Sequence, residues 1–153
     1  MDPDHIKAIS RTPDETRVIG KHIGATSCPG DLLLLYGELG SGKTCLTQGI
    51  LWGLGSDDYA RSPTFVMISE YQADIPLYHM DLYRLEIGHP TTELGVEEYM
   101  EGDGLCVVEW AERVPSLAER EHLAVHIDNQ GETNRLLTFS GVGQHYMDVI
   151  STL

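Results

Sequence analysis

LLLLY at residues 32–36 runs into GELGSGKT at residues 37–44 and CLTQGIL at residues 45–51, and the type of fold can be inferred from these residues. The leucine run has the length and composition of a buried strand, and a helical pattern follows the glycines. The spacing G-x-x-x-x-G-K-T between them is that of a P-loop, whose glycines let backbone N–H groups turn inward around a polyphosphate. The stretch therefore predicts a strand, a phosphate-binding loop and a helix.

The residues of this loop have different expected roles. The helix begins on top of the phosphates, where its unpaired N–H groups and positive dipole end favour an anion. Lys43 adds a positive charge near the terminal phosphates, and the hydroxyl of Thr44 is placed to bind Mg²⁺. A glycine-rich turn without a ligand is the alternative. The nucleotide-binding stretch comprises Gly37, Glu38, Leu39, Gly40, Ser41, Gly42, Lys43, Thr44 and Cys45. Cys45 belongs to it by position, and we expect no chemical role for its thiol.

The elements around this stretch predict a mixed sheet. Residues 64–71 and 77–83 are strand-like runs with so short a link that they predict an antiparallel hairpin. Three helices are also expected: one that starts at Thr12-Pro13 and ends at Gly24, the phosphate-loop helix that ends near Leu54, and a short one over 91–100. A helical or irregular connection, broken at Pro115, is expected over 111–121. Further strands are expected over 105–109, 123–127 and 135–139, and a turn at 128–131 joins the last two.

These elements predict an α/β protein, specifically a single-domain, three-layer fold of the P-loop NTPase type with a mixed central sheet. Residues 1–11 are polar and are expected to form a flexible N-terminus. Residues 12–153 are expected to form one domain, because this length buries a core and no repeat or linker interrupts it.

The composition restricts the partners. Lys and Arg number 10 against 24 Asp and Glu, and the net charge of −14 argues against a broad grip on nucleic acid or an anionic membrane. Cys28, Cys45 and Cys106 have no C-x-x-C spacing, so they indicate neither a disulfide framework nor a zinc site. Because neither a leader pattern nor a membrane-length apolar run is present, a cytoplasmic protein is expected.

Hydrolysis of a nucleotide needs a carboxylate for the metal and a group that orients water. Asp81 and Glu109 each close an apolar run, and ligands of open α/β sheets sit at the carboxyl ends of strands. Either carboxylate is a candidate to bind Mg²⁺ or to position water; the alternative for each is a solvated strand end. Thr64 is a candidate switch for the terminal phosphate, and Trp110 either stacks near the site or fills the core. The guanine motif N-K-x-D is absent, so an adenine nucleotide is expected.

Several motifs carry a family resemblance when they are taken together. They are, in order, the P-loop, S-P-T-F at 62–65, E-Y at 70–71, LYHMDLYR at 77–84, ELGVEEY at 93–99 and VVEW at 107–110. Over roughly residues 12–140 the chain closely resembles the bacterial TsaE family, the small P-loop ATPases of tRNA threonylcarbamoyladenosine synthesis. Two departures leave the required groups in place: Cys45 stands where a second threonine is common, and Ala111 where proline often follows the E-W pair.

The resemblance implies binding of ATP or ADP with Mg²⁺, weak ATPase activity alone, and work with TsaB-like and TsaD-like partners. TsaD transfers the threonylcarbamoyl group to an adenosine beside the tRNA anticodon, and ATP hydrolysis is thought to reset the complex, so the chain meets tRNA only indirectly. By motif match the catalytic residues are Lys43, Thr64, Asp81 and Glu109, the metal ligands are Thr44, Asp81 and Glu109, and Trp110 lies near the nucleotide.

Two other functions share the phosphate loop. A small-molecule kinase would also use it, but such enzymes bring an arginine-bearing lid over the phosphoryl group, and no lid-like insertion is visible in the sequence. A nucleotide-gated binding module would act through its bound state rather than through turnover.

Overall fold

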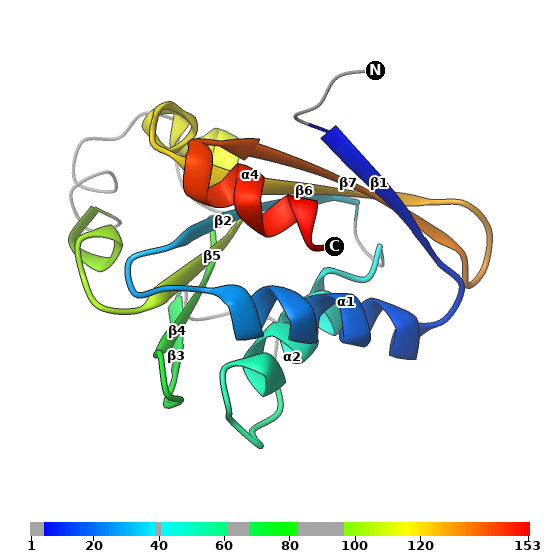
Figure 1. Ribbon diagram of the computed structural model, residues 1–153, viewed down its shortest axis with the longest axis horizontal. Helices are drawn as coiled ribbons and strands as arrows, with labels where there is room; N and C mark the ends of the chain where they lie inside the picture. The colour runs from blue at the N-terminus through cyan, green and yellow to red at the C-terminus, as the bar shows by residue number, and fades with distance from the viewer. Residues whose placement is uncertain (1–4, 39–40, 61–67, 83–96) are drawn as a thin grey trace.

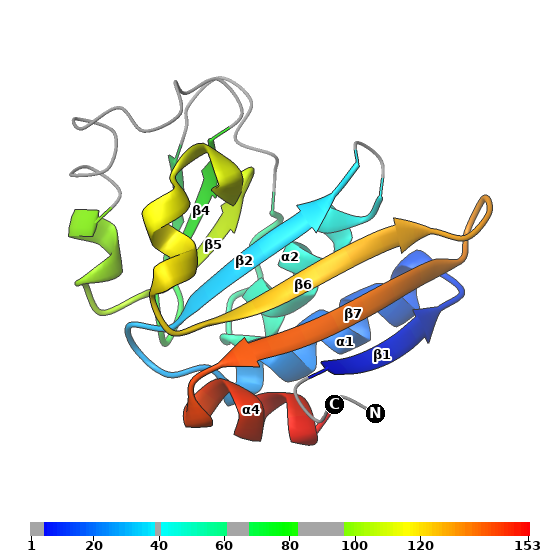
Figure 2. The same cartoon turned by 90° about the horizontal axis from the view of Figure 1, so that it is seen from above.

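A seven-stranded mixed sheet organises the protein (Figures 1 and 2). The computed structural model describes residues 5–38, 41–60, 68–82 and 97–153. The strand order is β1-β7-β6-β2-β5-β4-β3. The central strand β2 (Leu32–Gly37) is parallel to both of its neighbours, β5 (Leu105–Glu109) and β6 (His122–Asn129), and β4 (Leu77–Asp81) runs parallel to β5.

Antiparallel strands complete the sheet at both edges. At one edge β3 (Ile68–Tyr71) pairs antiparallel with β4, which confirms the predicted hairpin over these residues. The start of the first predicted run, residues 64–67, lies outside the described residues. At the other edge β7 (Arg135–Val142) pairs antiparallel with β6, and β1 (His5–Ser10) pairs antiparallel with β7. The prediction of a mixed sheet is therefore confirmed.

The leucine run of β2 alternates between two apolar clusters. Leu33 and Leu35 belong to the cluster beneath helices α1 (Pro13–Thr26), α2 (Lys43–Gly53) and α4 (Gln144–Ser151). Leu32 and Leu34 belong to the cluster on the other face, under the 3₁₀ helices η1 (Ala111–Arg113) and η2 (Pro115–Glu119), which lie in front of β5 in Figure 2. Because both faces of β2 are covered, its sequence is continuously apolar rather than alternating.

Helices α1 and α2 approach each other closely because glycines line their contact. A Cβ atom at Gly20 would overlap with the carbonyl oxygen of Leu46, and one at Gly49 would overlap with the carbonyl oxygen of Arg17. Gly24 likewise faces the carbonyl oxygen of Ile50. The prediction that Gly24 ends the helix is therefore wrong, since α1 continues to Thr26 and Gly24 serves the contact between helices.

The start of α1 follows the predicted pattern. Thr12 is the N-cap, and its side-chain oxygen accepts a hydrogen bond from the N–H of Glu15 at 3.1 Å. The carboxylate of Glu15 reaches back to the N–H of Arg11 at 2.6 Å, and Pro13 stands in the first turn. Acceptors thus satisfy exposed N–H groups at this helix end.

The sequence predictions differ from the structure at three further places. Residues 5–10, predicted as flexible, form β1, because pairing with β7 satisfies their backbone hydrogen-bonding groups. The local sequence does not predict this pairing, since β7 lies far along the chain. Helix α4 was not predicted. The turn predicted at 128–131 begins later, because β6 continues to Asn129 and the N–H of Gln130 closes the loop onto the carbonyl of Asn134 at 2.9 Å.

Candidate functional site

The carboxyl ends of three parallel strands meet at one edge of the sheet. The phosphate loop leaves the end of β2, Glu109 ends β5, and Asp81 ends β4. Glu109 lies opposite Leu35 of β2 on one side and opposite Asp81 of β4 on the other. The strand register therefore places Glu109 on the strand next to the phosphate loop and Asp81 one strand further along the same edge of the sheet.

The described parts of the loop have the geometry of a strand-to-helix turn. The N–H of Ser41 donates to the carbonyl of Glu38 at 3.0 Å, and α2 begins at Lys43. Gly42, the N-cap, has a φ of 107°, which favours glycine, and a Cβ there would meet no atom of the described residues within 4 Å. A Cβ at Gly37 would instead stand 2.6 Å from the hydroxyl of Ser41. Leu39 and Gly40 lie outside the described residues.

Polar groups around this turn fit a phosphate and its metal. No side chain among the described residues caps the N-terminus of α2, so its first N–H groups face outward from the helix. The buried hydroxyl of Ser41 has no hydrogen-bond partner in the described part of the chain. Thr44 is exposed in the first turn of α2. An anion at the helix end would give the hydroxyl of Ser41 a hydrogen-bond partner, and the exposed hydroxyl of Thr44 is the group that would hold Mg²⁺ beside it.

A buried carboxylate lies at the centre of the site. Glu109 is 4% exposed; its Oε2 lies 2.6 Å from Nε2 of His79, and its Oε1 lies 3.4 Å from Nζ of Lys43. His79 is fully buried and Lys43 is nearly so. The P-loop lysine, a strand-end glutamate and a strand histidine thus form one contact group, although they stand far apart in the sequence.

The surroundings of Glu109 control its protonation. Burial raises its pKa, but the hydrogen bond and electrostatic interaction with His79, followed by those with Lys43, lower it by more. The net result is a pKa below the ordinary value of 4.5. Glu109 is therefore an ionised carboxylate at neutral pH, suited to hold a cation or accept a proton rather than to donate one.

Trp110 stands beside this group in a strained backbone conformation. Its φ is 59°, and it is the residue other than glycine with a positive φ in the described part of the chain. Nζ of Lys43 lies 5.4 Å from the centre of its ring, and the residue also packs against the apolar cluster of the second face. Trp110 thus packs against the core and lies over Lys43, and its expected place beside a nucleotide stays a prediction. Such strain in a bulky residue is typical of functional positions.

The other predicted residues are only partly placed. Asp81 is half-buried at the end of β4, on the site's edge of the sheet. Cys45 is half-buried and lines, with Thr44 and Gln48, a cavity of about 230 Å³ beside the first turn of α2. Thr64 lies outside the described residues. The catalytic and metal-binding roles assigned to these residues stay predictions.

Two residues of the site were not singled out from the sequence. His79 and Asp81 are two positions apart on β4. Because side chains of a strand repeat their direction every two residues, both lie on the face that α2 covers. That alternation, together with the apolar neighbours of His79, was the available signal. Arg135 at the start of β7 donates from Nε to the carbonyl of Ser41 at 2.9 Å and so fastens the β6–β7 hairpin to the phosphate loop. This contact spans 94 positions and has no local signature.

Comparison with known proteins decides the family. The family described as "Threonylcarbamoyl adenosine biosynthesis protein TsaE" matches residues 10–137. The chain belongs to the TsaE family. It is 44% identical over 135 residues to the tRNA threonylcarbamoyladenosine biosynthesis protein TsaE of Bacillus subtilis, which covers 88% of this chain and 84% of that protein. The TsaE of Treponema pallidum is 34% identical over 133 residues, covering 87% of this chain and 98% of that protein.

A solved structure supports the same fold. The crystal structure of Bacillus subtilis YdiB superposes with a TM-score of 0.81 at 38% identity, and the match covers 97% of this chain and 93% of that one. The resemblance to TsaE drawn from motifs is thus confirmed, as is the mixed α/β fold. No helix in the described part of this TsaE-family protein is long and apolar enough to span a membrane.

Proposed function

We propose that this protein takes part in threonylcarbamoyladenosine biosynthesis on tRNA as an ATPase that depends on Mg²⁺ and is activated by TsaB-like and TsaD-like partners. The observation that carries the ATPase part is the buried carboxylate of Glu109, held by His79 and facing Lys43 at the start of α2. A loop that only bound phosphate would not need a carboxylate with a lowered pKa next to its lysine. Membership of the TsaE family supports the place in tRNA modification.

The residues of the site divide the work. The nucleotide would supply the phosphoryl group, with Mg²⁺ to neutralise the developing charge. Lys43 and the N-terminus of α2 hold phosphate oxygens, and Thr44 holds the metal. Glu109 and Asp81 bind that metal or orient the attacking water, directly or through a water molecule. His79 keeps the carboxylate of Glu109 oriented toward the loop.

The charge of the chain supports indirect work on RNA. With a net charge of −14 the protein repels the phosphate backbone, so contact with tRNA goes through other proteins. Surfaces that handle RNA are basic, and an acidic subunit is complementary to a protein that carries such a surface. This argument supports a partner-dependent role and leaves the docking surface open.

Phosphate release from Mg²⁺-ATP tests the proposal. We expect a low rate for the chain alone, a higher rate after addition of TsaB-like and TsaD-like proteins from the same cell, and loss of both rates in Lys43→Ala. Glu109→Gln should retain nucleotide binding and lose turnover by at least ~100-fold, because it removes an anionic group at the reaction centre. Glu112→Gln, which changes an exposed glutamate of η1, is the matched control and should keep both.

Each alternative function gives its own result. If Glu109→Gln loses turnover but cells that carry it modify tRNA fully, the protein is a nucleotide-gated binding module. If a phosphorylated metabolite accumulates and the partners do not stimulate phosphate release, it is a kinase. Either result would replace the ATPase proposal.

A further inference from the structure

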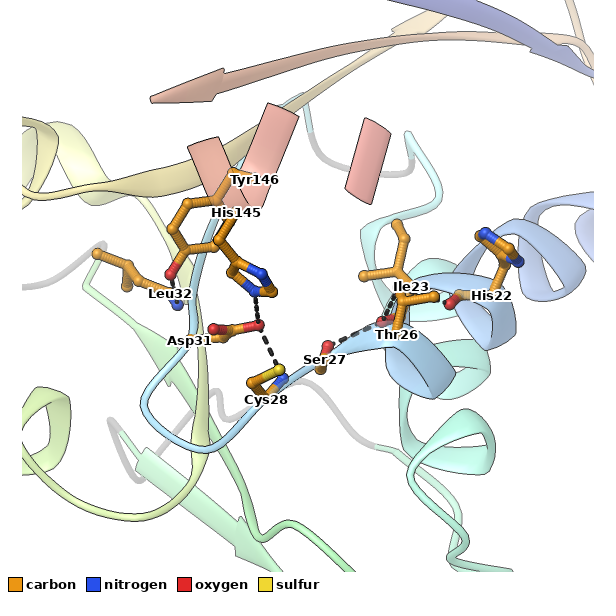
Figure 3. A network of polar contacts seen from close by, with 9 residues as sticks. All are labelled: His22, Ile23, Thr26, Ser27, Cys28, Asp31, Leu32, His145 and Tyr146. Atoms are coloured by element: carbon orange, nitrogen blue, oxygen red, sulfur yellow. Dashed lines mark hydrogen bonds and ion pairs between the residues drawn. The ribbon is translucent and has the colours of Figure 1, made fainter. Parts of the chain in front are cut away.

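Three side chains with metal-binding chemistry gather at the end of β2 opposite the phosphate loop (Figure 3). Cys28 and Asp31 lie in the turn that precedes β2, and His145 lies in the first turn of α4. One ligand atom from each lies within 4.8 Å of the other two. None of the three belongs to the nucleotide site, which follows the other end of the same strand.

Hydrogen bonds from backbone N–H groups hold the turn and α4 in place around this cluster. Oδ2 of Asp31 accepts a hydrogen bond from the N–H of Cys28 at 2.9 Å, and the N–H of Asp31 returns to the carbonyl of Cys28 at 3.1 Å. From α4, the hydroxyl of Tyr146 accepts a hydrogen bond from the N–H of Leu32 at 3.0 Å. The backbone hydrogen bond between Asp31 and Cys28 and the contact of Tyr146 with Leu32 place the turn and the helix without the thiol of Cys28 or the imidazole of His145, so both elements are in position before any ion binds.

Asp31 also contacts the histidine directly. Its Oδ2 lies 2.9 Å from Nε2 of His145, and in Figure 3 both the imidazole and Cys28 converge on this carboxylate. The contact between Asp31 and His145 would be complete without the thiol of Cys28. The additional thiol completes a set of sulfur, imidazole nitrogen and carboxylate oxygen, which are the ligands that Zn²⁺ takes in proteins.

The distances and the surroundings suit a small cation. Zinc bonds of ~2.0–2.3 Å at tetrahedral angles put ligand atoms ~3.3–3.8 Å apart, so the cluster needs only small side-chain rotations to close around an ion. Cys28 is exposed and His145 is half-exposed, which leaves room for such rotations. A cavity of about 440 Å³ adjoins Asp31 and His145 and is also lined by Glu121. It gives space for water at a fourth coordination position.

We propose that Cys28, Asp31 and His145 bind a divalent transition-metal ion of the zinc class. The ion would join α4 to the turn before β2, and its fourth position would face the cavity. The cysteine spacing alone indicated no zinc site, because the histidine stands 114 positions after Asp31 and only the fold brings it near.

Cobalt spectroscopy on the nucleotide-free, chelator-treated protein tests the proposal. We expect one equivalent of Co²⁺ to produce a thiolate-to-cobalt charge-transfer band that Zn²⁺ displaces. Cys28→Ser should abolish the band. His145→Ala should weaken Co²⁺ binding by at least ~10-fold, because removing a residue that binds the metal costs more affinity than removing one that only hydrogen-bonds to a ligand. Cys45→Ser is the matched control. It should keep the band, because Cys45 is a thiol outside the proposed ligand set and any Co²⁺ bound through oxygen atoms at the phosphate loop would give no thiolate absorption.

A second measurement needs no variant at these positions. In the unmodified protein, Zn²⁺ should protect Cys28 from alkylation at neutral pH and leave the alkylation of Cys45 unchanged. The absence of a charge-transfer band, a band that persists in Cys28→Ser, or equal alkylation of Cys28 with and without Zn²⁺ would overturn the proposal. The cluster would then be an Asp31–His145 pair with a neighbouring thiol.

Discussion

His79 acts on Glu109 through a single short hydrogen bond inside the protein. Because Nε2 of His79 lies 2.6 Å from the carboxylate and both residues are buried, its removal leaves an ionised group short of a partner. We expect His79→Ala to lower the free energy of unfolding by about 1–3 kcal/mol in urea titrations. It should also lower kcat more than it raises KM, because Glu109 loses its orientation.

A conservative variant separates the effect of the hydrogen bond to Glu109 from the effect of the lost side-chain volume. His79→Gln keeps a side-chain N–H donor near Glu109 and should recover part of the lost kcat. Equal loss of kcat in both variants would mean that an amide cannot take the place of the imidazole, and unchanged kcat in His79→Ala would contradict the positioning role.

Cys106 is a thiol that the fold keeps protonated. Burial raises its pKa from 9.0 to about 12, and its Sγ donates to the carbonyl of Tyr99 at 3.4 Å. Since the pKa is raised in the folded state, the stabilisation from the protonated thiol is present below pH 9 and is lost as the pH rises through about 12. At pH 8, with chelator present, a thiol reagent should label the exposed Cys28 and leave Cys106 unmodified until urea unfolds the chain.

Peptide mass spectrometry follows each cysteine separately. Cys28 serves as the internal control for reagent activity, and the unfolded protein serves as the control for access to Cys106. Labelling of Cys106 at the rate of Cys28 in the folded protein would contradict its burial.

At the scale of elements, the contact between α1 and α2 depends on missing side chains. Alanine is favoured over glycine within a helix by about 1 kcal/mol, so propensity alone predicts that Gly49→Ala stabilises the protein. The new Cβ would overlap with the carbonyl oxygen of Arg17, and the helices must separate to make room. We therefore expect a net loss of about 1–3 kcal/mol in the free energy of unfolding, measured by urea titration.

Val18→Ala is the control for this prediction. Val18 is 68% exposed on α1, so its truncation should change stability by no more than about 0.5 kcal/mol. Stabilisation by Gly49→Ala would show that α1 and α2 do not approach each other in solution so closely that a Cβ atom is excluded.

Elements differ in how well local sequence predicts them. The strand at 105–109 and the cap of α1 follow from short patterns, because burial on both faces and the first helical turn each leave a local trace. The edge strand β1 leaves a weaker trace, since its residues 5–9 alternate between exposed and half-buried, the apolar Ile9 among the exposed ones, and its hydrogen bonds go to β7 at the far end of the chain. Gly24 shows the opposite case, in which a local stop signal gives way to packing between helices.

At the scale of the whole molecule, a ligand that binds only the folded state stabilises it. At a nucleotide concentration of ~100 times Kd the gain is about 2.7 kcal/mol, which for a domain of this size raises Tm by about 5–10 °C. We expect Mg²⁺-ADP to raise Tm by this amount in thermal unfolding experiments. Lys43→Ala should abolish the increase, because the bound phosphates lose their charged partner.

Lys21→Ala removes an exposed lysine from α1 and should retain the increase in Tm. This control separates the local effect of Lys43 from the general effect of one more negative net charge. An increase in Tm that survives in Lys43→Ala would mean that the nucleotide binds elsewhere.

The amino-acid sequence was sufficient to predict the strand and helix on either side of residues 37–42, the mixed sheet and the family. These features are readable because each is either a run of consecutive residues or a set of motifs in fixed order, with a physical requirement at every position. The strand-end carboxylates Asp81 and Glu109 were also predicted to lie beside the loop, since parallel strands share a carboxyl edge.

The contacts between distant residues became visible only in the folded chain. It sets His79 against Glu109, the guanidinium of Arg135 against the backbone carbonyl of Ser41, and His145 against Asp31, across 30, 94 and 114 positions of the chain. Strand order, register and helix docking bring these pairs together, and those depend on burial of apolar area over the whole domain rather than on any local pattern. The sequence thus specified the chemistry available at each position, and the packed fold specified which groups act together.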